Sequence, residues 1–311
     1  MPQTIPVVSL EAYRNGSAAD QADFVRVFGD ALREFGFVSV TDHGVDRALI
    51  QRTYDVIARF FALPVETKKK CIVEGAMGNR GFVGFGEEHA KDRKVGDLKE
   101  FFHVGREIPS LGPGGKNAFP SEVPDFEATT RALFDQLDAA ATVMLRGLAG
   151  VFGAPEDTFA KMSVGGNSIL RLIHYPPLKE RFIAGGVRAA EHEDINLITL
   201  LCESTQPGLE ILTKSGKWLA IEAPPGHIVV DTGDMMQRIT NGHLPAVTHR
   251  VVNPARDADD VVRYSIPFFV HPFPTCPLDV LPFCTSDADP PKWPPITAQA
   301  FLEERLRELG L

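Results

Sequence analysis

Two side chains two residues apart, His192 and Asp194, are the first candidates for metal chemistry in this chain of 311 residues. If the segment around them is extended, both side chains project from the same face of a sheet. A third candidate, His249, follows in a later strand-like run, AVTHRVV. Two neutral imidazoles and one carboxylate form the triad that binds non-haem Fe(II) and leaves coordination positions open. The pattern therefore predicts an iron site.

An isolated His-x-Asp pair is weak support, because the chain contains nine histidines and 41 acidic residues. His227 and His243 compete with His249 for the third position. Each of these histidines also has a plain interpretation as an ordinary surface, loop or strand residue. A zinc hydrolase, or a protein that holds a structural or sensory metal without turnover, would use the same three ligands.

A second pair with the same spacing, Arg263 and Ser265, lies in the run VVRYSIPFF. Arginine offers a planar fork of donors for a carboxylate, and serine adds a hydroxyl on the same face of a strand. An arginine inside an apolar run is costly to bury without an anionic partner. The pair predicts a bound carboxylate, with an edge-strand arginine in a surface ion pair as the alternative.

Helical patterns dominate the first half of the sequence, and strand patterns dominate the second. Seven short apolar runs from Ser168 to Val270, separated by turn residues, predict an antiparallel sandwich or barrel. The other predicted elements are a strand over 5–10, a helix over 21–35, a strand over 37–40, a helix over 46–62, a solvated charge cluster over 66–70, a mobile glycine-rich loop over 75–86, a long helix over 126–152 and a terminal helix capped by Thr297.

Composition narrows the class of protein and its partners. The net charge of −9 gives no electrostatic reason to bind nucleic acid or an anionic membrane. A hydrophobic content of 44% with a mean hydropathy of −0.05 is typical of a globular chain. The N-terminal segment does not resemble a signal peptide, and no apolar run is long enough to span a bilayer, so we expect a cytoplasmic protein. Its four cysteines form no C-x-x-C pair and are expected to be reduced thiols.

Motifs along most of the chain resemble the isopenicillin-N-synthase-like family of 2-oxoglutarate- and Fe(II)-dependent oxygenases. They are, in order, IPVVSL, GFVSVTDHGVD, FFALPVETK, KEFFHVGRE, HYPP, HEDINLITLL, the stretch around VVDTGDMMQRITNG, THRVV and RYSIPFF. The resemblance implies an α+β, mainly β fold: a double-stranded β-helix, or jelly roll, with N-terminal helices and a long supporting helix. It implies one integrated domain, 1–311, made of an N-terminal region 1–124, supporting helices 125–163, the jelly-roll core 164–275 and a C-terminal extension 276–311.

The same resemblance assigns roles to individual positions. His192, Asp194 and His249 correspond to the iron ligands, and the protein contributes no catalytic group beyond the metal centre. Arg263 and Ser265 correspond to the pair that holds the far carboxylate of 2-oxoglutarate, and Tyr175 to the tyrosine beside this cosubstrate. Gln237, Asn241 and Gly242 correspond to a scaffold stretch. The chain departs from the family at Ile173, where many members have asparagine.

The implied reaction couples oxidative decarboxylation of 2-oxoglutarate by O₂ to oxidation, by default hydroxylation, of a small organic molecule, with ascorbate as an auxiliary reductant. Two alternatives stay open: a 2-oxoglutarate-independent Fe(II) oxidase, in which Arg263 and Ser265 bind the substrate carboxylate, and a non-catalytic jelly-roll metal-binding protein. Neither the substrate nor the oligomeric state follows from the sequence. Candidate substrate contacts, with core packing as their alternative, are Arg80, Phe82, Phe85, Phe102 and Phe269.

Overall fold

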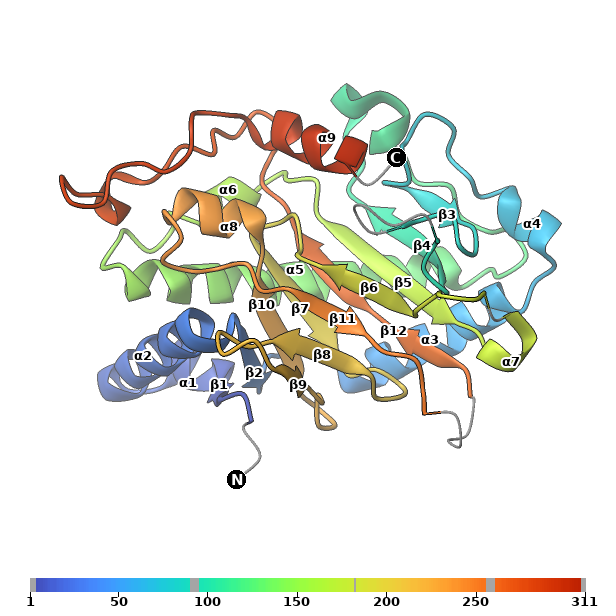
Figure 1. The fold of residues 1–311 in the computed structure, drawn as a ribbon, viewed down its shortest axis with the longest axis horizontal. Helices are drawn as coiled ribbons and strands as arrows, with labels where there is room; N and C mark the ends of the chain where they lie inside the picture. Colours follow the sequence, from blue (N-terminus) through green and yellow to red (C-terminus); the bar gives the residue numbers. More distant parts are fainter. Residues whose placement is uncertain (1–3, 90–94, 182, 256–260, 309–311) are drawn as a thin grey trace.

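Two facing β-sheets and a layer of helices form the computed structural model of the chain, which describes residues 4–89, 95–181, 183–255 and 261–308. In Figure 1 the smaller sheet lies in front of the larger one, and the long helix α5 (Phe126–Val151) runs behind the larger sheet. This arrangement confirms the predicted α+β, mainly β architecture.

The larger sheet follows the order β1-β2-β10-β7-β13-β5-β4-β3, and β12 also pairs with β5. Its strands are β1 (Val7–Ser9), β2 (Phe37–Thr41), β3 (Gly81–Val83), β4 (Glu100–Gly105), β5 (Ile169–Tyr175), β7 (Ile198–Cys202), β10 (Ile228–Thr232), β12 (Arg263–Ser265) and β13 (Pro267–Val270). The smaller sheet, in the order β6-β11-β8-β9, contains β6 (Ala189–His192), β8 (Leu209–Leu212), β9 (Trp218–Ala220) and β11 (His249–Val251). Four strands from the N-terminal region thus complete a sheet whose centre comes from the predicted jelly-roll core.

Helices cover the outer face of the larger sheet. Helix α5 contacts β4, β7 and β13, and it packs against the two N-terminal helices α2 and α3. The Phe134 ring on α5 meets the Phe268 ring of β13 edge to face, with centroids 4.9 Å apart. The remaining helices are α1 (Leu10–Asn15), α2 (Ala18–Phe35), α3 (Arg47–Phe61), α4 (Val65–Lys69), α6 (Ala160–Ser163), α7 (Leu178–Arg181), α8 (Asp234–Ile239), α9 (Ala298–Glu308) and two 3₁₀ turns, Pro109–Gly115 and Pro282–Cys284.

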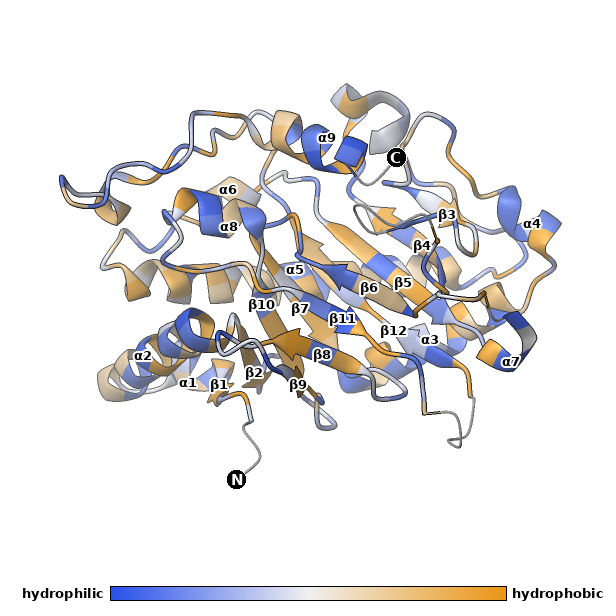
Figure 2. Cartoon of the chain, viewed as in Figure 1, coloured by the Kyte–Doolittle hydropathy of each residue, from blue (hydrophilic) through white to orange (hydrophobic). Residues whose placement is uncertain are grey.

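One buried apolar cluster runs through these layers, from Val8 near the start of the chain to Leu306 in α9. Figure 2 shows the same pattern as hydrophobic colouring on the central strands and on the inner side of the helices. The four cysteines are buried and free, as expected for reduced thiols. None of the helices within the described residues is long and apolar enough to cross a bilayer.

Side-chain caps explain why two N-terminal elements differ from their predicted bounds. The predicted strand over 5–10 is shorter, because the Ser9 hydroxyl accepts a hydrogen bond from the Ala12 N–H at 3.4 Å and starts α1 at Leu10. Helix α2 begins at Ala18 rather than 21, because Ser17 and Asp20 form a capping box. It ends at Gly36, whose φ of 67° permits the left-handed turn into β2.

Two expectations for residues 66–86 were wrong. The segment 66–70 is not uniformly solvated: Lys68 is buried, and its ammonium lies 2.7 Å from the buried Glu100 carboxylate. The glycine-rich stretch 75–86 is not only a loop, because Gly81–Val83 forms β3 against β4. Both elements depend on β4, which the sequence analysis did not predict, because its residues are buried on both faces and show no alternation of apolar and polar side chains.

Candidate metal centre and adjoining cavities

His192, Asp194 and His249 converge where the smaller sheet faces the larger one. His192 ends β6 and His249 begins β11, and the two residues are direct partners in the strand register. Strand β6 stops before Asp194, so its carboxylate approaches from the following loop rather than from the predicted extended strand. One ligand atom from each residue lies within 4.8 Å of the others.

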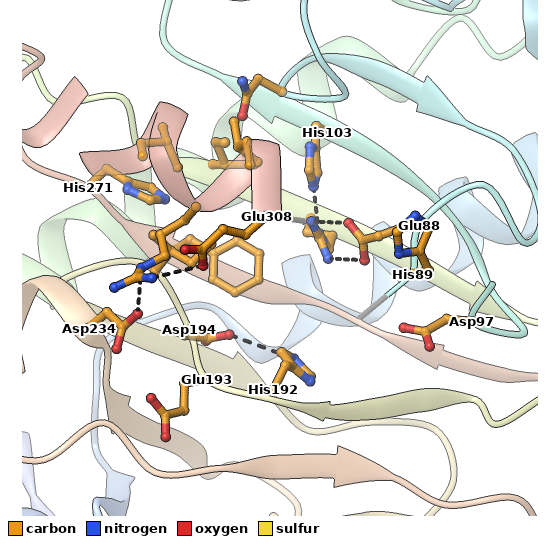
Figure 3. Close-up of a pocket in the computed structure, with 18 of the residues that line it drawn as sticks. Glu88, His89, Asp97, His103, His192, Glu193, Asp194, Asp234, His271 and Glu308 are labelled. Atoms are coloured by element: carbon orange, nitrogen blue, oxygen red, sulfur yellow. Dashed lines mark hydrogen bonds and ion pairs between the residues drawn. The ribbon is translucent and has the colours of Figure 1, made fainter. Parts of the chain in front are cut away.

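The separations within this cluster fit a single metal ion. His192 Nε2 lies 3.9 Å from Asp194 Oδ1 (Figure 3). His249 Nε2 lies 3.8 Å from the same oxygen. Ligand atoms about 2.1 Å from one ion and on one face of it lie about 3.0 to 3.4 Å apart. The two histidines would therefore each need to move less than about 1 Å toward Asp194 to share one ion with it.

Hydrogen bonds behind the two imidazoles fix which nitrogen faces the cluster. Nδ1 of His192 lies 2.7 Å from the Ala190 carbonyl oxygen, and Nδ1 of His249 lies 3.1 Å from that of Val247. A carbonyl only accepts, so each Nδ1 carries the proton and each Nε2 presents a lone pair to the metal position. Burial, and secondarily the neighbouring His249, lowers the pKa of His192 to about 4, which keeps that imidazole neutral.

The Asp194 carboxylate is held from the larger sheet. Its Oδ2 accepts a hydrogen bond from the hydroxyl of Thr199 on β7, and the Asn196 side-chain amide donates to the same hydroxyl at 2.8 Å. The nearby Asp231 on β10 is buried, and burial together with Asp194 raises its pKa well above the usual value. Asp194 is thus oriented, while its other oxygen, Oδ1, faces the two histidines.

A small cavity of about 60 Å³ lies beside the cluster, between the two sheets. It is lined by His192, Asp194 and His249 and also by Tyr175, Arg263 and Ser265. Because Arg263 and Ser265 are two residues apart on β12, both side chains face the cavity, and only 1% of Arg263 is exposed. The alternative of a surface arginine is therefore wrong.

The Arg263 guanidinium is only partly satisfied by the protein. Its Nε donates to the Gln206 carbonyl oxygen at 3.0 Å, and its Cζ lies 4.9 Å from the centre of the Tyr175 ring. Its Nη1 is buried and has no hydrogen-bond partner among the described residues. A buried charge with an unused donor is stabilised by an anionic partner, so the donor set fits a carboxylate ligand such as that of 2-oxoglutarate.

A larger cavity of about 510 Å³ opens from the same cluster. Figure 3 shows that its wall combines residues from the loop before β4, from the segment after β6 and from α8. The last wall comes from α9, where Leu302, Arg305 and Leu306 face the cavity and Arg305 Nε lies 3.5 Å from Asp234 Oδ2. His271, after β13, also lines it: its Nδ1 is buried without a partner among the described residues, and burial lowers its pKa to about 4.

A buried ionic network forms the boundary between the two cavities. Arg171 on β5 makes a two-pronged ion pair with the Glu88 carboxylate, at 3.1 Å and 3.0 Å. Its Nε donates to His103 Nε2 at 2.6 Å, while His103 Nδ1 donates to a backbone carbonyl. Lys99 Nζ lies 2.9 Å from Glu88 and 2.8 Å from Asp97. Burial and Arg171 keep the pKa of His103 well below its usual value, so the network is built from paired charges and a neutral imidazole.

Three of the five predicted substrate contacts are buried and are not among the residues that line either cavity. Arg80 is 1% exposed, and its guanidinium donates to Asn167 Oδ1 at 2.7 Å. The rings of Phe82 and Phe102 pack edge to face against Phe60, with centroids 5.9 Å and 5.2 Å away. These contacts match the alternative interpretation of all three residues, which is core packing.

The two remaining predicted substrate contacts, Phe269 and Phe85, lie in different places. Phe269 lines both cavities, whereas Phe85 does not line either one and lies under the Arg181 guanidinium, 5.5 Å from ring centre to Cζ. The competing histidines are elsewhere: His227 Nδ1 lies 2.8 Å from Ser39 Oγ, and His243 lies beside an exposed aspartate. Neither is near the cluster of His192.

The proposed scaffold stretch has hydrogen bonds that suit a structural role. Gln237 Oε1 accepts from the Ala246 N–H at 3.0 Å, and Asn241 Oδ1 accepts from the Lys292 N–H at 3.0 Å. Gly242 has a φ of 81°, a conformation that glycine adopts without strain. Ile173, the departure from the family pattern, lines the small cavity with an apolar side chain.

Sequence reasoning missed Lys99, Arg171, His103 and His271 as site residues. Lys99 and His103 lie in KEFFHVGRE, two residues before and two residues after Phe101. Arg171 lies in a predicted strand, two residues before Ile173. This spacing was the available signal for these three residues. The pattern becomes informative only when the pairing of β4 with β5 is known, because that register places the two rows on one face.

Comparison with known proteins agrees with this geometry. The family model for the 2OG-Fe(II) oxygenase superfamily matches residues 166–272, and that for the N-terminal region of non-haem dioxygenases in morphine synthesis matches residues 5–125. The chain belongs to the 2OG-Fe(II) oxygenase superfamily, and it is an enzyme that depends on Fe(II), 2-oxoglutarate and O₂.

Individual relatives cover nearly the whole chain. The 2-oxoglutarate-Fe(II) type oxidoreductase hxnY of Emericella nidulans is 30% identical over 96% of this chain and 88% of its own length. A crystal structure from Caulobacter crescentus, described as a member of the 2OG-Fe(II) oxygenase family, is 40% identical over 99% of both chains, with a TM-score of 0.86. A full-length Neurospora crassa protein, crystallised in complex with alpha-KG and thymine, is 26% identical over 97% of this chain and 96% of that chain, also with a TM-score of 0.86. These similarities favour neither the 2-oxoglutarate-independent oxidase nor the non-catalytic metal-binding protein.

Proposed function

We propose that His192, Asp194 and His249 hold the iron of this oxygenase and that Arg263, Ser265 and Tyr175 bind 2-oxoglutarate. The observation that carries the assignment is the position of the buried Arg263, which has an unused donor in the same small cavity as the three converging ligand atoms. When bound, the iron and the cosubstrate supply the oxidising chemistry that turns 2-oxoglutarate and O₂ into succinate, CO₂ and an oxidised product.

The protein's own groups bind and orient in this scheme. Backbone carbonyls keep the two imidazoles in the tautomer that presents Nε2, and Thr199 orients the Asp194 carboxylate. Arg263 donates to the far carboxylate of the cosubstrate through Nη1, with the Ser265 hydroxyl beside it on the same strand face. Because these groups sit on paired strands, they are held in place before any ligand arrives.

We further propose that the larger cavity takes the primary substrate, a small polar organic molecule. Its wall carries many polar side chains, with Phe269 as an aromatic contact next to the cluster. Hydroxylation is the proposed outcome, because it requires only one substrate C–H bond to be oriented, whereas desaturation or ring closure requires a second reacting position. Ascorbate as an auxiliary reductant and a cytoplasmic location remain predictions from the sequence.

The region boundaries 1–124, 125–163, 164–275 and 276–311 are proposed as parts of one integrated domain. The apolar cluster shared by Val8 and Leu306, and the contribution of β1 to β4 to the larger sheet, support this interpretation. A chain cut between the first two regions is therefore expected to lose the folded core.

A substrate screen tests the proposed reaction. Full-length protein is incubated with Fe(II), 2-oxoglutarate, ascorbate and a library of small polar molecules under O₂, and succinate is measured together with products that are heavier by one oxygen atom. Stoichiometric succinate and product, with the added oxygen derived from ¹⁸O₂, is the expected result. If no library member yields succinate under Fe(II), or if product forms without 2-oxoglutarate, the proposed reaction is wrong.

A further inference from the structure

Lys99 is the least expected charged residue at the boundary between the two cavities. It lines both of them, and its side chain is 5% exposed. Five residues line both cavities: His192 and Asp194 of the proposed iron site, Phe269, Arg171 and Lys99. Three of the five N–H donors of Arg171 are already used, by the Glu88 carboxylate and by His103.

The ammonium of Lys99 has one donor left. A lysine ammonium offers three N–H donors, and two of them meet Glu88 and Asp97. No other partner of this group occurs among the described residues. Burial opposes the charged form, but Glu88 and Asp97 outweigh it and raise the pKa of Lys99, so the group stays a cation at neutral pH.

Strand register places Lys99 at one end of a row of ligand-binding side chains. Arg263 on β12 is paired with Tyr175 on β5. On the other side of β5, His174 is paired with Glu100, so the next pair in this antiparallel register is Tyr175 with Lys99. Two strand spacings, about 9.5 Å, separate the backbones of Arg263 and Lys99. Two cations therefore bracket Tyr175 across three adjacent strands, which suits a ligand with a carboxylate at each end.

Ile173 cannot make a polar contact in the small cavity, but Lys99 is placed to make one there. Ile173 is paired with Phe101, so it is the diagonal neighbour of Lys99 on the same sheet face. Both side chains line the small cavity, but only Lys99 carries a donor. Asp97, which binds the Lys99 ammonium, also accepts from the Ala190 N–H at 3.1 Å, and the Ala190 carbonyl oxygen binds His192 Nδ1. These bonds tie the ammonium to the metal end of the row.

We propose that Lys99 is a cosubstrate-binding residue that donates its third N–H to the keto-acid carboxylate of 2-oxoglutarate, a contact that Ile173 cannot make. The proposal rests on the proposed function, in which the same cavity binds 2-oxoglutarate. Arg263 and Lys99 then divide the work, with Arg263 holding the far carboxylate and Lys99 the carboxylate next to the metal. The paired acids Glu88 and Asp97 keep the ammonium in position.

Two keto acids separate these roles in a binding experiment. Full-length Fe(II)-loaded protein is titrated anaerobically with 2-oxoglutarate and, separately, with 2-oxobutyrate, which has the keto-acid end but no far carboxylate; calorimetry gives each Kd. Lys99→Met is expected to weaken both ligands by about 10-fold, the size of one lost charge-assisted hydrogen bond. Lys99→Arg keeps the charge and is expected to stay within about threefold of the parent protein. Arg263→Met is the comparator, expected to weaken 2-oxoglutarate but not 2-oxobutyrate.

Each outcome decides between the alternatives. An unchanged Kd for 2-oxoglutarate in Lys99→Met, or a loss confined to 2-oxoglutarate, overturns the proposed contact and leaves the proposed function standing. A parent protein that binds neither keto acid overturns the proposed function itself. If Lys99→Met unfolds because two buried acids lose their cation, Asp97→Asn/Lys99→Met restores the charge balance, and the same ratio of the two Kd values is measured.

Discussion

The two cavities that meet at His192 are built in different ways. The small cavity is enclosed by the two sheets, and Arg263, Ser265 and Tyr175 reach it from paired strands. The larger cavity is bounded by segments far apart in the chain, including the loop before β4 and helix α9. The proposed iron and cosubstrate site thus rests on strand register, whereas the wall proposed for the substrate rests on connections that vary more easily. Substitutions in the small cavity should therefore reduce metal or cosubstrate binding, whereas substitutions in the larger cavity should mainly reduce stability.

Removing a proposed iron ligand beside the small cavity should have the largest effect. His192→Ala and His249→Ala each leave two ligands, so we expect loss of bound Fe(II) and at least a ~1000-fold loss of succinate formation, since ligand geometry supports the whole reaction. Metal content is measured by elemental analysis and turnover by succinate release. His243→Gln is the matched control, because His243 lies outside the cluster. Full metal content in either alanine variant would contradict the ligand assignment.

Loss of the Arg263 guanidinium should affect the same cavity without emptying the metal site. Arg263→Met removes the proposed charge-assisted contact and the buried positive charge, so the Kd for 2-oxoglutarate should rise by about 30- to 100-fold. Metal content should stay at the parent level. Arg250→Met is the control, because Arg250 pairs with Glu191 and Glu210 outside the small cavity. Equal effects of the two variants would show that Arg263 has no special role in binding.

In the larger cavity, a comparable substitution should reduce stability, and it should weaken cosubstrate binding less than Arg263→Met does. Glu88→Gln leaves Arg171 and Lys99 without their shared carboxylate in a buried network, which should cost about 3 kcal/mol of unfolding free energy. Denaturant unfolding measures the loss. Glu66→Gln breaks an exposed pair with Lys69 and should cost less than about 0.5 kcal/mol. If Glu88→Gln weakened 2-oxoglutarate binding more than Arg263→Met, the separation of the two cavities would be wrong.

The smallest expected effect is a pH dependence from His271. Burial lowers the pKa of His271 in the folded protein to about 4, so the unfolded chain, with a usual histidine pKa of about 6.5, binds a proton that the folded chain does not. Stability from this group is present above about pH 6.5 and falls by about 2 kcal/mol between pH 7 and pH 5. His271→Phe should therefore lose less stability than the parent chain over that interval. Parallel pH profiles of metal-free protein, measured by chemical denaturation, would contradict the assignment.

The sequence predicts most residues of the small cavity that the proposed function uses, for a physical reason. The spacing of Arg263 with Ser265 places both side chains on one face of β12. The spacing of His192 with Asp194 also brings these two together, although Asp194 lies in the loop after β6. Family resemblance then adds His249 and Tyr175, and the structure brings all six residues to one cavity. In the small cavity, the local spacing of residues and the order of the family motifs along the chain lead to the same set of residues.

The remaining site residues depend on information that no short pattern carries. Arg171 and His103 are charged or polar residues in strands, and Lys99 directly precedes β4. Their role in the site is visible only when β4 is paired with β5. Lys68 looked solvated because its partner Glu100 is distant in the chain. Phe82 and Phe102 looked like possible pocket residues because an aromatic side chain suits a core equally well.

The pairing of β2 with β10 has a consequence for how the enzyme is made. Val40 pairs with Ile228, and β10 in turn pairs with β7 near the iron site, so early and late parts of the chain share one sheet. During translation the N-terminal strand emerges long before its neighbour exists, and contacts so distant in sequence form slowly. The nascent chain must therefore keep β2 from aggregating until nearly the whole protein has left the ribosome, and only then can the iron site be assembled.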